Sequence, residues 1–263
     1  MSKTLQLLSL LPRNPAEFCD RVAAGLETRR RNSKQAHVNY RVSTNDKALS
    51  QLSRILGNDL DEKLRELELA QLEAFVEQRQ GKLIVGAPFS ALHNGGSILA
   101  RMCYAIARVT RPTVVVESGV CYGVTSAYLL QALQLNRHGH LHSIDLPPLG
   151  KHGDSYVGTL VPRDLRNCWS LHRGTTRRLL PRLLTSLAQI DLFLHDSLHT
   201  YENMCREFTA VWPRLSPGGV LISDDVEGNG AFQELSQRKD ATFSVVLRES
   251  GKQALFGIAV KQS

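Results

Sequence analysis

Short apolar runs alternate with amphipathic stretches along most of the chain after residue 84. The apolar runs are rich in β-branched residues, which favours strands, and the stretches between them repeat apolar positions at helical spacing. Strands are expected at Thr113–Ser118, His140–Asp145, Ser170–Gly174, Ile190–Asp196 and Gly219–Asp224, with helices at 124–135, 162–168, 175–187, 200–213 and 229–238. This alternation predicts an α/β fold in which helices cover both faces of a parallel sheet.

The last two apolar runs break this alternation. Ala241–Arg248 and Ala254–Lys261 are separated only by residues 249–253, a connection too short to hold a crossover helix. Two strands joined this closely are expected to pair as an antiparallel hairpin. The sequence therefore predicts a Rossmann-like, doubly wound sheet with five parallel strands and a C-terminal antiparallel hairpin.

Residues 1–83 follow a different pattern and are expected to form a helical N-terminal extension or cap, ahead of the main domain at 84–263. Between Lys47 and Phe75 the apolar positions form one face of an amphipathic helix, interrupted near Gly57; they are Leu49, Leu52, Ile55, Leu56, Leu60, Leu64, Leu67, Leu72 and Phe75. Such a face needs a partner, either the main domain or a second subunit. A homo-oligomer formed through these helices is therefore one expectation.

Composition places the chain among ordinary globular proteins. Of its 263 residues, 42% are hydrophobic and 22% are charged, which suits a sizeable core. No apolar run approaches the ~18 residues of a membrane span, and the N-terminus lacks the basic lead and cleavage site of a signal peptide. The five cysteines are scattered without CxxC spacing, which argues against a disulfide framework and a zinc knuckle. A cytoplasmic protein with no membrane partner is expected.

The net charge of +7 raises the question of a nucleic-acid partner. The strongest basic run, residues 29–34, has no interleaved aromatics, and Arg173, Arg177, Arg178 and Arg182 fall at a strand end and on the next helix. Solvated helix faces account for most of this charge, and attraction to an anionic substrate or a nucleic acid is the alternative. Because aromatics make up only 6% of the chain, a nucleic acid is the less favoured partner.

A glycine turn between the first strand and its helix gives the clearest ligand-binding signal. Its spacing is Glu117-x-Gly119-x-x-x-Gly123, with Tyr122 inside the turn. Glycines let the backbone turn tightly and allow a ligand to approach the main chain. The spacing differs from the Gly-x-Gly-x-x-Gly run that holds a dinucleotide, and Glu117 would repel a diphosphate. The turn therefore favours a cationic ligand.

A second carboxylate supports a nucleoside ligand. Asp145 ends the second strand, 22 residues beyond Gly123, where a carboxylate can accept hydrogen bonds from both ribose hydroxyls of an adenosine. Gly174 and Thr175 follow the third strand, near the expected place of an adenine ring. Each signal also has a structural explanation, because Asp145 can cap a helix and Thr175 can begin one. Their register within one β-α-β unit favours cofactor binding.

These motifs resemble those of class I S-adenosylmethionine-dependent methyltransferases, and so do segments 190–196 and 212–225. More narrowly, the chain looks like the small-molecule O-methyltransferases that include cephalosporin-biosynthesis and macrolide-sugar enzymes, with the match over residues 84–261. The resemblance implies the strand order 3-2-1-4-5-7-6 and S-adenosylmethionine as the cofactor. The cofactor contacts it implies are Glu117, Gly119, Tyr122, Gly123, Asp145, Gly174, Thr175 and Asp196.

Three carboxylates follow neighbouring strands: Asp196 after the fourth, and Asp224 with Asp225 after the fifth. The carboxyl ends of such strands line the ligand crevice, and converging carboxylates repel one another unless a cation lies among them. Oxygen ligands favour Mg²⁺, Ca²⁺ or Mn²⁺. In the family that the chain resembles, the matching residues hold a divalent ion, although some relatives have Asn at the position of Asp225. Alternatively, Asp196 contacts the cofactor amine and the other two cap a helix or stay solvated.

His199 lies three residues after Asp196, in the loop above the sheet, where a general base could reach a substrate hydroxyl. Orienting the next helix is the alternative role. His195 precedes Asp196 on the strand, so its side chain is expected on the opposite face, in a structural role. The long segment 147–162 after the second strand is expected to help shape the substrate site.

Three functions remain open at this stage. The favoured one is methyl transfer to a hydroxyl of a small molecule such as a sugar or polyketide, with Asp196, Asp224 and Asp225 holding Mg²⁺ and with His199 and Asp196 catalytic. The second is a metal-free methyltransferase that acts on nitrogen or on a nucleic acid. The third is a non-catalytic cofactor-binding protein. The sequence contains no Asn/Asp-Pro-Pro-aromatic stretch of the kind that amino methyltransferases carry, which lowers the second.

Overall fold

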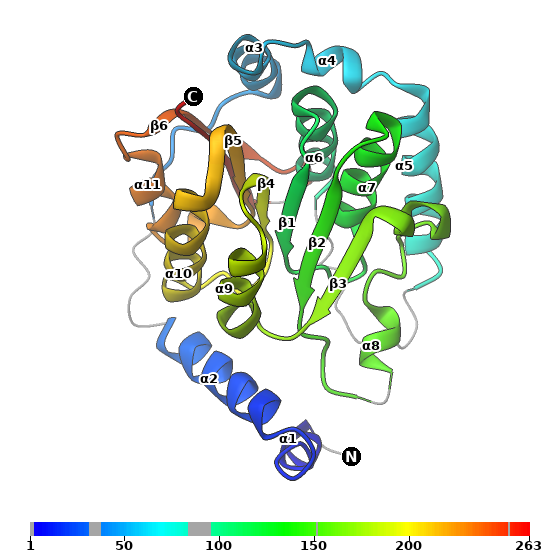
Figure 1. The fold of residues 1–263 in the computed structure, drawn as a ribbon, viewed down its shortest axis with the longest axis vertical. Coiled ribbons are helices and arrows are strands. Elements are labelled where there is room, and N and C mark those ends of the chain that lie inside the picture. Colours follow the sequence, from blue (N-terminus) through cyan, green and yellow to red (C-terminus); the bar gives the residue numbers. More distant parts are fainter. Residues whose placement is uncertain (1–2, 32–37, 84–95, 151, 252) are drawn as a thin grey trace.

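The computed structural model describes residues 3–31, 38–83, 96–150, 152–251 and 253–263. Within them a seven-stranded sheet has the order β3-β2-β1-β4-β5-β7-β6, as predicted (Figure 1). Its strands are β1 Val114–Ser118, β2 His140–Asp145, β3 Trp169–Arg173, β4 Ile190–His195, β5 Leu215–Ser223, β6 Ala241–Arg248 and β7 Leu255–Lys261. Strands β1 to β5 are parallel, and β7 pairs antiparallel with both β5 and β6, which confirms the predicted hairpin.

Several strand ends differ from the prediction by a few residues. β3 lies one residue earlier than the predicted Ser170–Gly174, because Gly174 has a φ of +156°, outside the strand region. β5 begins before the predicted Gly219. At the carboxyl edge, β4 and β5 each stop one residue short of the predicted end. Asp196 and Asp224 are therefore the first residues of the loops beyond these strands.

Helices cover both faces of the sheet (Figure 1). The helices after residue 96 are α6 Ser97–Thr110, α7 Val124–Asn136, α8 Gly153–Tyr156, α9 Thr176–Ser186, α10 Tyr201–Val211 and α11 Ala231–Ser236, with 3-10 turns η2 Arg163–Cys168, η3 Trp212–Arg214 and η4 Val226–Gly228. Side chains of β1 alternate between two apolar cores, with Val115 beside α6 and α7 and Val116 beside α9 and α10. The sheet is thus buried on both faces, as parallel sheets are.

The N-terminal residues form the helices α1 Lys3–Leu8, α2 Pro15–Arg31, α3 Asn45–Leu56, α4 Leu60–Lys63 and α5 Leu67–Gln80. The helix predicted over 47–75 is broken after α3, where Gly57 has a φ of +73°. Leu52, Leu60 and Leu69 are fully buried in the same core as α6 and α7. Most of the predicted apolar face therefore packs against α6 and α7 of the same chain, whereas Ile55 and Leu67 are exposed.

No helix among the described residues combines the length and apolar character that a membrane crossing requires. The basic run at 29–34 falls at the end of α2, and the part of it beyond Arg31 lies outside the described residues.

Candidate active site

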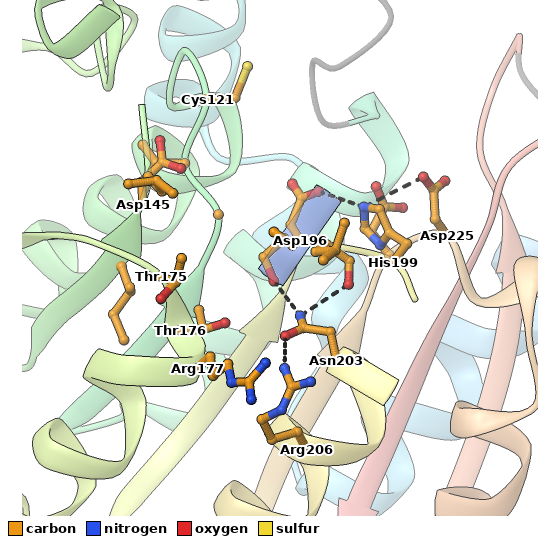
Figure 2. A pocket seen from close by; sticks show the side chains of 18 of the residues that line it. Cys121, Asp145, Thr175, Thr176, Arg177, Asp196, His199, Asn203, Arg206 and Asp225 are labelled. Carbon is orange, nitrogen blue, oxygen red and sulfur yellow. Dashed lines mark hydrogen bonds and ion pairs between the residues drawn. The ribbon is translucent and has the colours of Figure 1, made fainter. Parts of the chain in front are cut away.

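A cavity of about 640 Å³ lies at the carboxyl ends of the parallel strands (Figure 2). Loops that follow β1 to β5 contribute to its walls. The predicted site residues that line it are Gly119, Asp145, Gly174, Thr175, Asp196, His199, Asp224 and Asp225. Residues that are distant in the sequence thus meet around one cavity, with Asp145 at one end and the acidic residues at the other (Figure 2).

Gly119 brings the loop after β1 against the loop after β4. Its φ is +85°, and a Cβ atom at this position would lie 1.9 Å from the carbonyl oxygen of Asp196. Its N–H donates a hydrogen bond to the carbonyl oxygen of Ile144 at 2.9 Å. A residue larger than glycine would separate the two loops, because backbone atoms cannot yield as a flexible side chain can. The predicted need for glycine therefore has a structural cause at this position.

Gly123 has a different role. Its φ is +87°, and a Cβ atom there would lie 2.9 Å from the Cα atom of Gly158. The segment after β2 packs on the glycine turn at this point, with the N–H of Leu160 donating to the carbonyl oxygen of Tyr122 at 2.9 Å. No described residue of 147–162 lines the cavity. The segment expected to shape the substrate site instead buttresses the glycine turn.

Glu117 and Tyr122, expected at the cofactor, do not line the cavity. The Glu117 side chain is fully buried and accepts hydrogen bonds from the hydroxyls of Thr125, Ser126 and Ser143 at 2.6–2.9 Å. Tyr122 is buried against Tyr156. Together with Gly123, these residues support the glycine turn from behind. The sequence pattern identifies the turn but does not reveal which side its residues face.

Burial raises the pKa of Glu117 to about 7, despite the three hydroxyl donors that lower it. Because the folded protein binds this proton more tightly than the unfolded chain, its stabilising effect is complete below pH ~4.5 and is lost as the pH rises through 7. As the pH rises from ~4.5 to 7, we expect the unfolding free energy of the wild type to fall by roughly 3 kcal/mol because of this group. The unfolding free energy of Glu117→Gln should not show this fall. Urea denaturation at several pH values measures this, with the exposed Glu62→Gln as control. Parallel pH profiles for wild type and Glu117→Gln would refute the assignment.

At the carboxyl end of β2, Asp145 has the properties of a ribose ligand. Burial raises its pKa to about 6. Its Oδ2 atom is buried and has no hydrogen-bond partner in the described part of the chain, and the same holds for the hydroxyl of Thr175. Buried polar atoms are normally paired, and unpaired ones indicate a missing partner. The ribose hydroxyls of an adenosine would supply two donors here, so these residues fit the adenosine part of the implied cofactor.

Helix α2 closes this end of the cavity, which sequence reasoning did not predict. Asp20, Ala24 and Glu27 of α2 line the wall, and in Figure 1 the helix lies beyond the carboxyl ends of the strands. Three ion pairs join it to the main domain: Glu17–Arg173 at 2.6 Å, Asp20–Arg178 at 3.0 Å and Glu27–Arg206 at 3.0 Å. No described apolar residue of α2 belongs to either core. Arg173 and Arg178 belong to the basic group that the sequence predicts to be a solvated helix face, and both pair with α2 instead.

At the opposite end, Asp196, His199 and Asp224 form a cluster in which one ligand atom from each lies within 4.8 Å of the others. The Nε2 atom of His199 is 3.9 Å from Asp196 Oδ1 and 3.6 Å from Asp225 Oδ2 (Figure 2). Burial and the neighbouring carboxylates raise the pKa of Asp196 well above its usual value. Burial and the charge of Asp225 raise that of Asp224 to about 7.

The cluster differs from the predicted metal set in one residue, since His199 joins it and Asp225 lies outside it. Asp225 adopts the left-handed conformation, with a φ of +48°, and its side chain is 41% exposed. Neighbouring, partly buried carboxylates that repel one another are stabilised by a bound cation, so Asp196 and Asp224 fit a divalent ion. Two carboxylate oxygens suit Mg²⁺ or Mn²⁺, and the added imidazole nitrogen favours the softer Mn²⁺. If Nε2 of His199 binds the metal ion, this nitrogen cannot also act as a general base.

Glu249, which the sequence did not single out, fixes the wall beside this cluster. Its buried carboxylate accepts hydrogen bonds from the backbone N–H groups of Ile98 and Leu99, both at 3.0 Å, and so caps the start of α6. A Cβ atom on Gly96 would lie 1.9 Å from this carboxylate. Gly96 and Glu249 both line the cavity. The β6–β7 hairpin thus contributes to the site, because Glu249 of its connection caps the distant helix α6.

Comparisons with known proteins agree with this geometry. Residues 116–226 match a family model described as a methyltransferase domain, and the matched segment contains the glycine turn, Asp145 and the acidic cluster. No curated protein matches the chain in sequence.

Solved structures share the fold at low sequence identity. An O-methyltransferase from Bacillus cereus in complex with S-adenosylhomocysteine (SAH) is 15% identical, with a TM-score of 0.58 over 82% of this chain and 97% of that one. The O-methyltransferase TomG from Streptomyces achromogenes, in complex with S-adenosylmethionine, is 16% identical, with a TM-score of 0.56 over 82% and 96%. The SAH-bound methyltransferase PaMTH1 from Podospora anserina is 12% identical, with a TM-score of 0.52 over 86% and 100%.

Proposed function

We propose that this class I S-adenosylmethionine-dependent methyltransferase transfers a methyl group to a hydroxyl oxygen of a small molecule, with a divalent cation held by Asp196, His199 and Asp224. One observation carries the proposal: a single cavity joins the unpaired carboxylate oxygen of Asp145 to this acidic cluster. The distance along the strand ends from β2 to β5 allows a nucleoside at one end and an acceptor at the other.

At the cofactor end, the Asp145 carboxylate accepts hydrogen bonds from the ribose, and the tight turn at Gly119 leaves room for the methionine part. Helix α2 covers the adenosine and excludes water from it. Asp196, whose loop touches Gly119, contributes to both ends of the cavity. These residues mainly hold the reactants in line for transfer, and alignment of this kind supplies much of the rate enhancement in such reactions.

At the acceptor end, a bound divalent ion would lower the pKa of an acceptor hydroxyl and fix its oxygen. Asp196 and Asp224 would hold that ion from two neighbouring loops. His199 lies 3.6 Å from Asp225, so it is held between acidic groups whether it binds the ion or accepts the acceptor's proton. Its place in the cluster favours the ligand role over the base role expected from the sequence. The hydroxyl proton would then pass to solvent water as the C–O bond forms and the C–S bond of the sulfonium breaks.

The acceptor is proposed to be a hydroxylated small molecule, such as a sugar or polyketide. The O-methyltransferases among the similar structures support oxygen as the acceptor atom, and the resemblance to cephalosporin-biosynthesis and macrolide-sugar enzymes remains a prediction. A nucleic-acid acceptor is disfavoured, because Arg173, Arg178 and Arg206 are engaged by acidic residues of α2.

The test is transfer of a labelled methyl group from S-adenosylmethionine to a panel of hydroxylated small molecules, with Mg²⁺ or Mn²⁺ and with EDTA. We expect label on an oxygen atom, and a rate that falls about 100-fold in EDTA and returns with either ion. An unchanged rate in EDTA would refute the role of the metal ion, and label on nitrogen would refute oxygen as the acceptor atom. Failure to bind S-adenosylmethionine would refute the proposal as a whole.

A further inference from the structure

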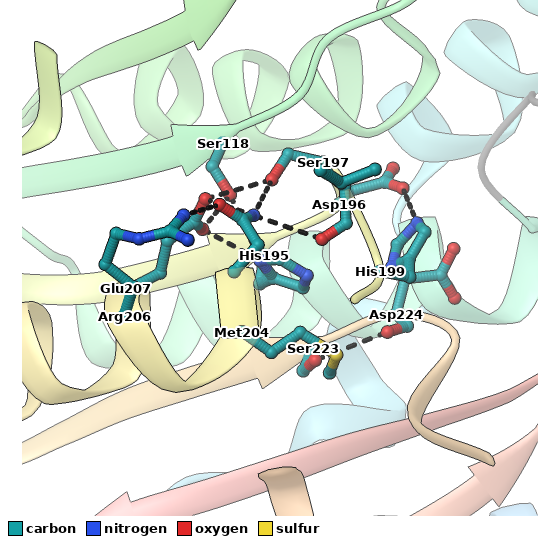
Figure 3. Close-up of polar contacts among 12 residues, drawn as sticks. Ser118, His195, Asp196, Ser197, His199, Met204, Arg206, Glu207, Ser223 and Asp224 are labelled. Carbon is teal, nitrogen blue, oxygen red and sulfur yellow. Dashed lines mark hydrogen bonds and ion pairs between the residues drawn. The ribbon is translucent and has the colours of Figure 1, made fainter. Parts of the chain in front are cut away.

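A buried carboxylate beneath the cavity has no part in the proposed reaction. Glu207 of α10 is 1% exposed and faces the sheet. It accepts hydrogen bonds from Ser118 Oγ at 2.7 Å, Ser197 Oγ at 3.0 Å and Asn203 Nδ2 at 2.9 Å, and its Oε2 atom lies 2.8 Å from Nδ1 of His195 (Figure 3). One carboxylate therefore joins the end of β1, the end of β4, the loop after β4 and α10.

The cost of burying this charge indicates that the position requires a carboxylate. Removing an ionised group from water is unfavourable unless its partners replace the lost solvation. Burial alone raises the pKa of Glu207, but the charge of His195 and hydrogen bonds from His195 and Ser118 bring it to about 2. Leucine or methionine would fill a purely structural position without that cost.

The partners of Glu207 fix the loop at residues 196–200. Ser197 is in this loop, and Asn203 also donates to the carbonyl oxygen of Leu198 at 3.0 Å and to the hydroxyl of Ser197 at 3.2 Å. The loop also carries Asp196 and His199. The ring of His199 also meets the ring of His195 edge-on, with 5.3 Å between centroids. The carboxylate thus holds the backbone from which both candidate ligands project (Figure 3).

We propose that Glu207 is a positioning residue for the acceptor end of the site: through Ser197, Asn203 and His195 it holds the loop so that Asp196 and His199 face Asp224. The inference rests on the proposed function for the purpose of that arrangement. The geometry of the loop is a separate matter and can be tested without any metal or acceptor.

The decisive variant is Glu207→Gln, which keeps the volume but replaces one acceptor oxygen with an amide NH₂ that faces other donors. The matched control is Val211→Ala, one turn further along α10, which removes buried apolar volume without touching the loop. Binding of Mn²⁺ and of SAH is measured by calorimetry, and stability by thermal unfolding. We expect Glu207→Gln to raise the Kd for Mn²⁺ about tenfold or more and to raise the Kd for SAH less, because only one end of the cofactor's contact with the loop, at Asp196, is affected. Val211→Ala should bind Mn²⁺ like the wild type, even if its melting temperature falls as much as that of Glu207→Gln.

A wild-type Kd for Mn²⁺ in Glu207→Gln, or equal weakening in Val211→Ala, would overturn the proposal. If the wild type itself binds no Mn²⁺, the metal in the proposed function fails, and a crystal structure of Glu207→Gln then tests the inference alone. The inference predicts that the loop moves and that His199 loses its 3.6 Å approach to Asp225. A loop that stays in place would refute it.

Discussion

Asp224→Asn is expected to abolish divalent-ion binding and to lower methyl transfer by about 100-fold or more, while SAH still binds. The substitution keeps the shape of the side chain but removes one of the two partly buried carboxylates of the cluster. An amide oxygen is a weaker ligand, and the remaining charge of Asp196 does not suffice to hold the ion. Calorimetry with Mn²⁺ and SAH, together with the labelled-methyl assay, measures both effects.

Asp225→Asn is the matched control for this experiment. Asp225 is adjacent in sequence but lies outside the three-atom cluster, with a more exposed side chain. We expect it to retain most of the Mn²⁺ affinity and activity. Equal losses in the two variants would contradict the cluster. They would favour instead the metal ligands that the sequence predicts, Asp196, Asp224 and Asp225.

Asp145→Asn is expected to raise the Kd for SAH by about 30-fold, which corresponds to roughly 2 kcal/mol. The ionised carboxylate offers two acceptor oxygens to the ribose hydroxyls, whereas an asparagine offers one and turns its NH₂ group toward the other hydroxyl. Because the pKa of Asp145 is raised to about 6, the ionised form is lost as the pH falls through 6. Wild-type affinity should therefore fall below this pH, and the affinity of the variant should not.

Calorimetric titration of SAH at several pH values checks both parts of this prediction. The exposed Asp154→Asn serves as control for the general effect of removing a carboxylate near this end of the cavity. If Asp145→Asn binds SAH as tightly as the wild type does, the adenosine does not bind at Asp145. A variant that keeps the wild-type pH dependence would assign that dependence to another group.

The fold was predictable because the signals that specify it are local. Buried strands read as apolar runs, the helices between them repeat at helical spacing, and the connection at 249–253 is too short for anything but a hairpin. The positions of Asp145, Asp196 and Asp224 follow from the fold, since residues after parallel strands gather at one edge. Their meeting around one cavity is therefore a consequence of the predicted topology.

The remaining features depend on side-chain direction and long-range packing, which the sequence pattern does not encode. Glu117 stands at the expected place but faces Ser143 and α7. Asp225, whose backbone is left-handed, lines the cavity but lies outside the cluster, and His199 joins Asp196 and Asp224 instead. The pairing of Glu17 with Arg173 joins residues far apart in the sequence, so α2 gave no local sign of covering the cavity.

A crystal structure of the protein with SAH and Mn²⁺ tests the central claim most directly. We expect the ribose hydroxyls on the carboxylate of Asp145, the sulfur atom beside Gly119 and the ion among Asp196, His199 and Asp224. SAH bound away from Asp145, or an ion bound apart from the cavity that holds SAH, would contradict the account.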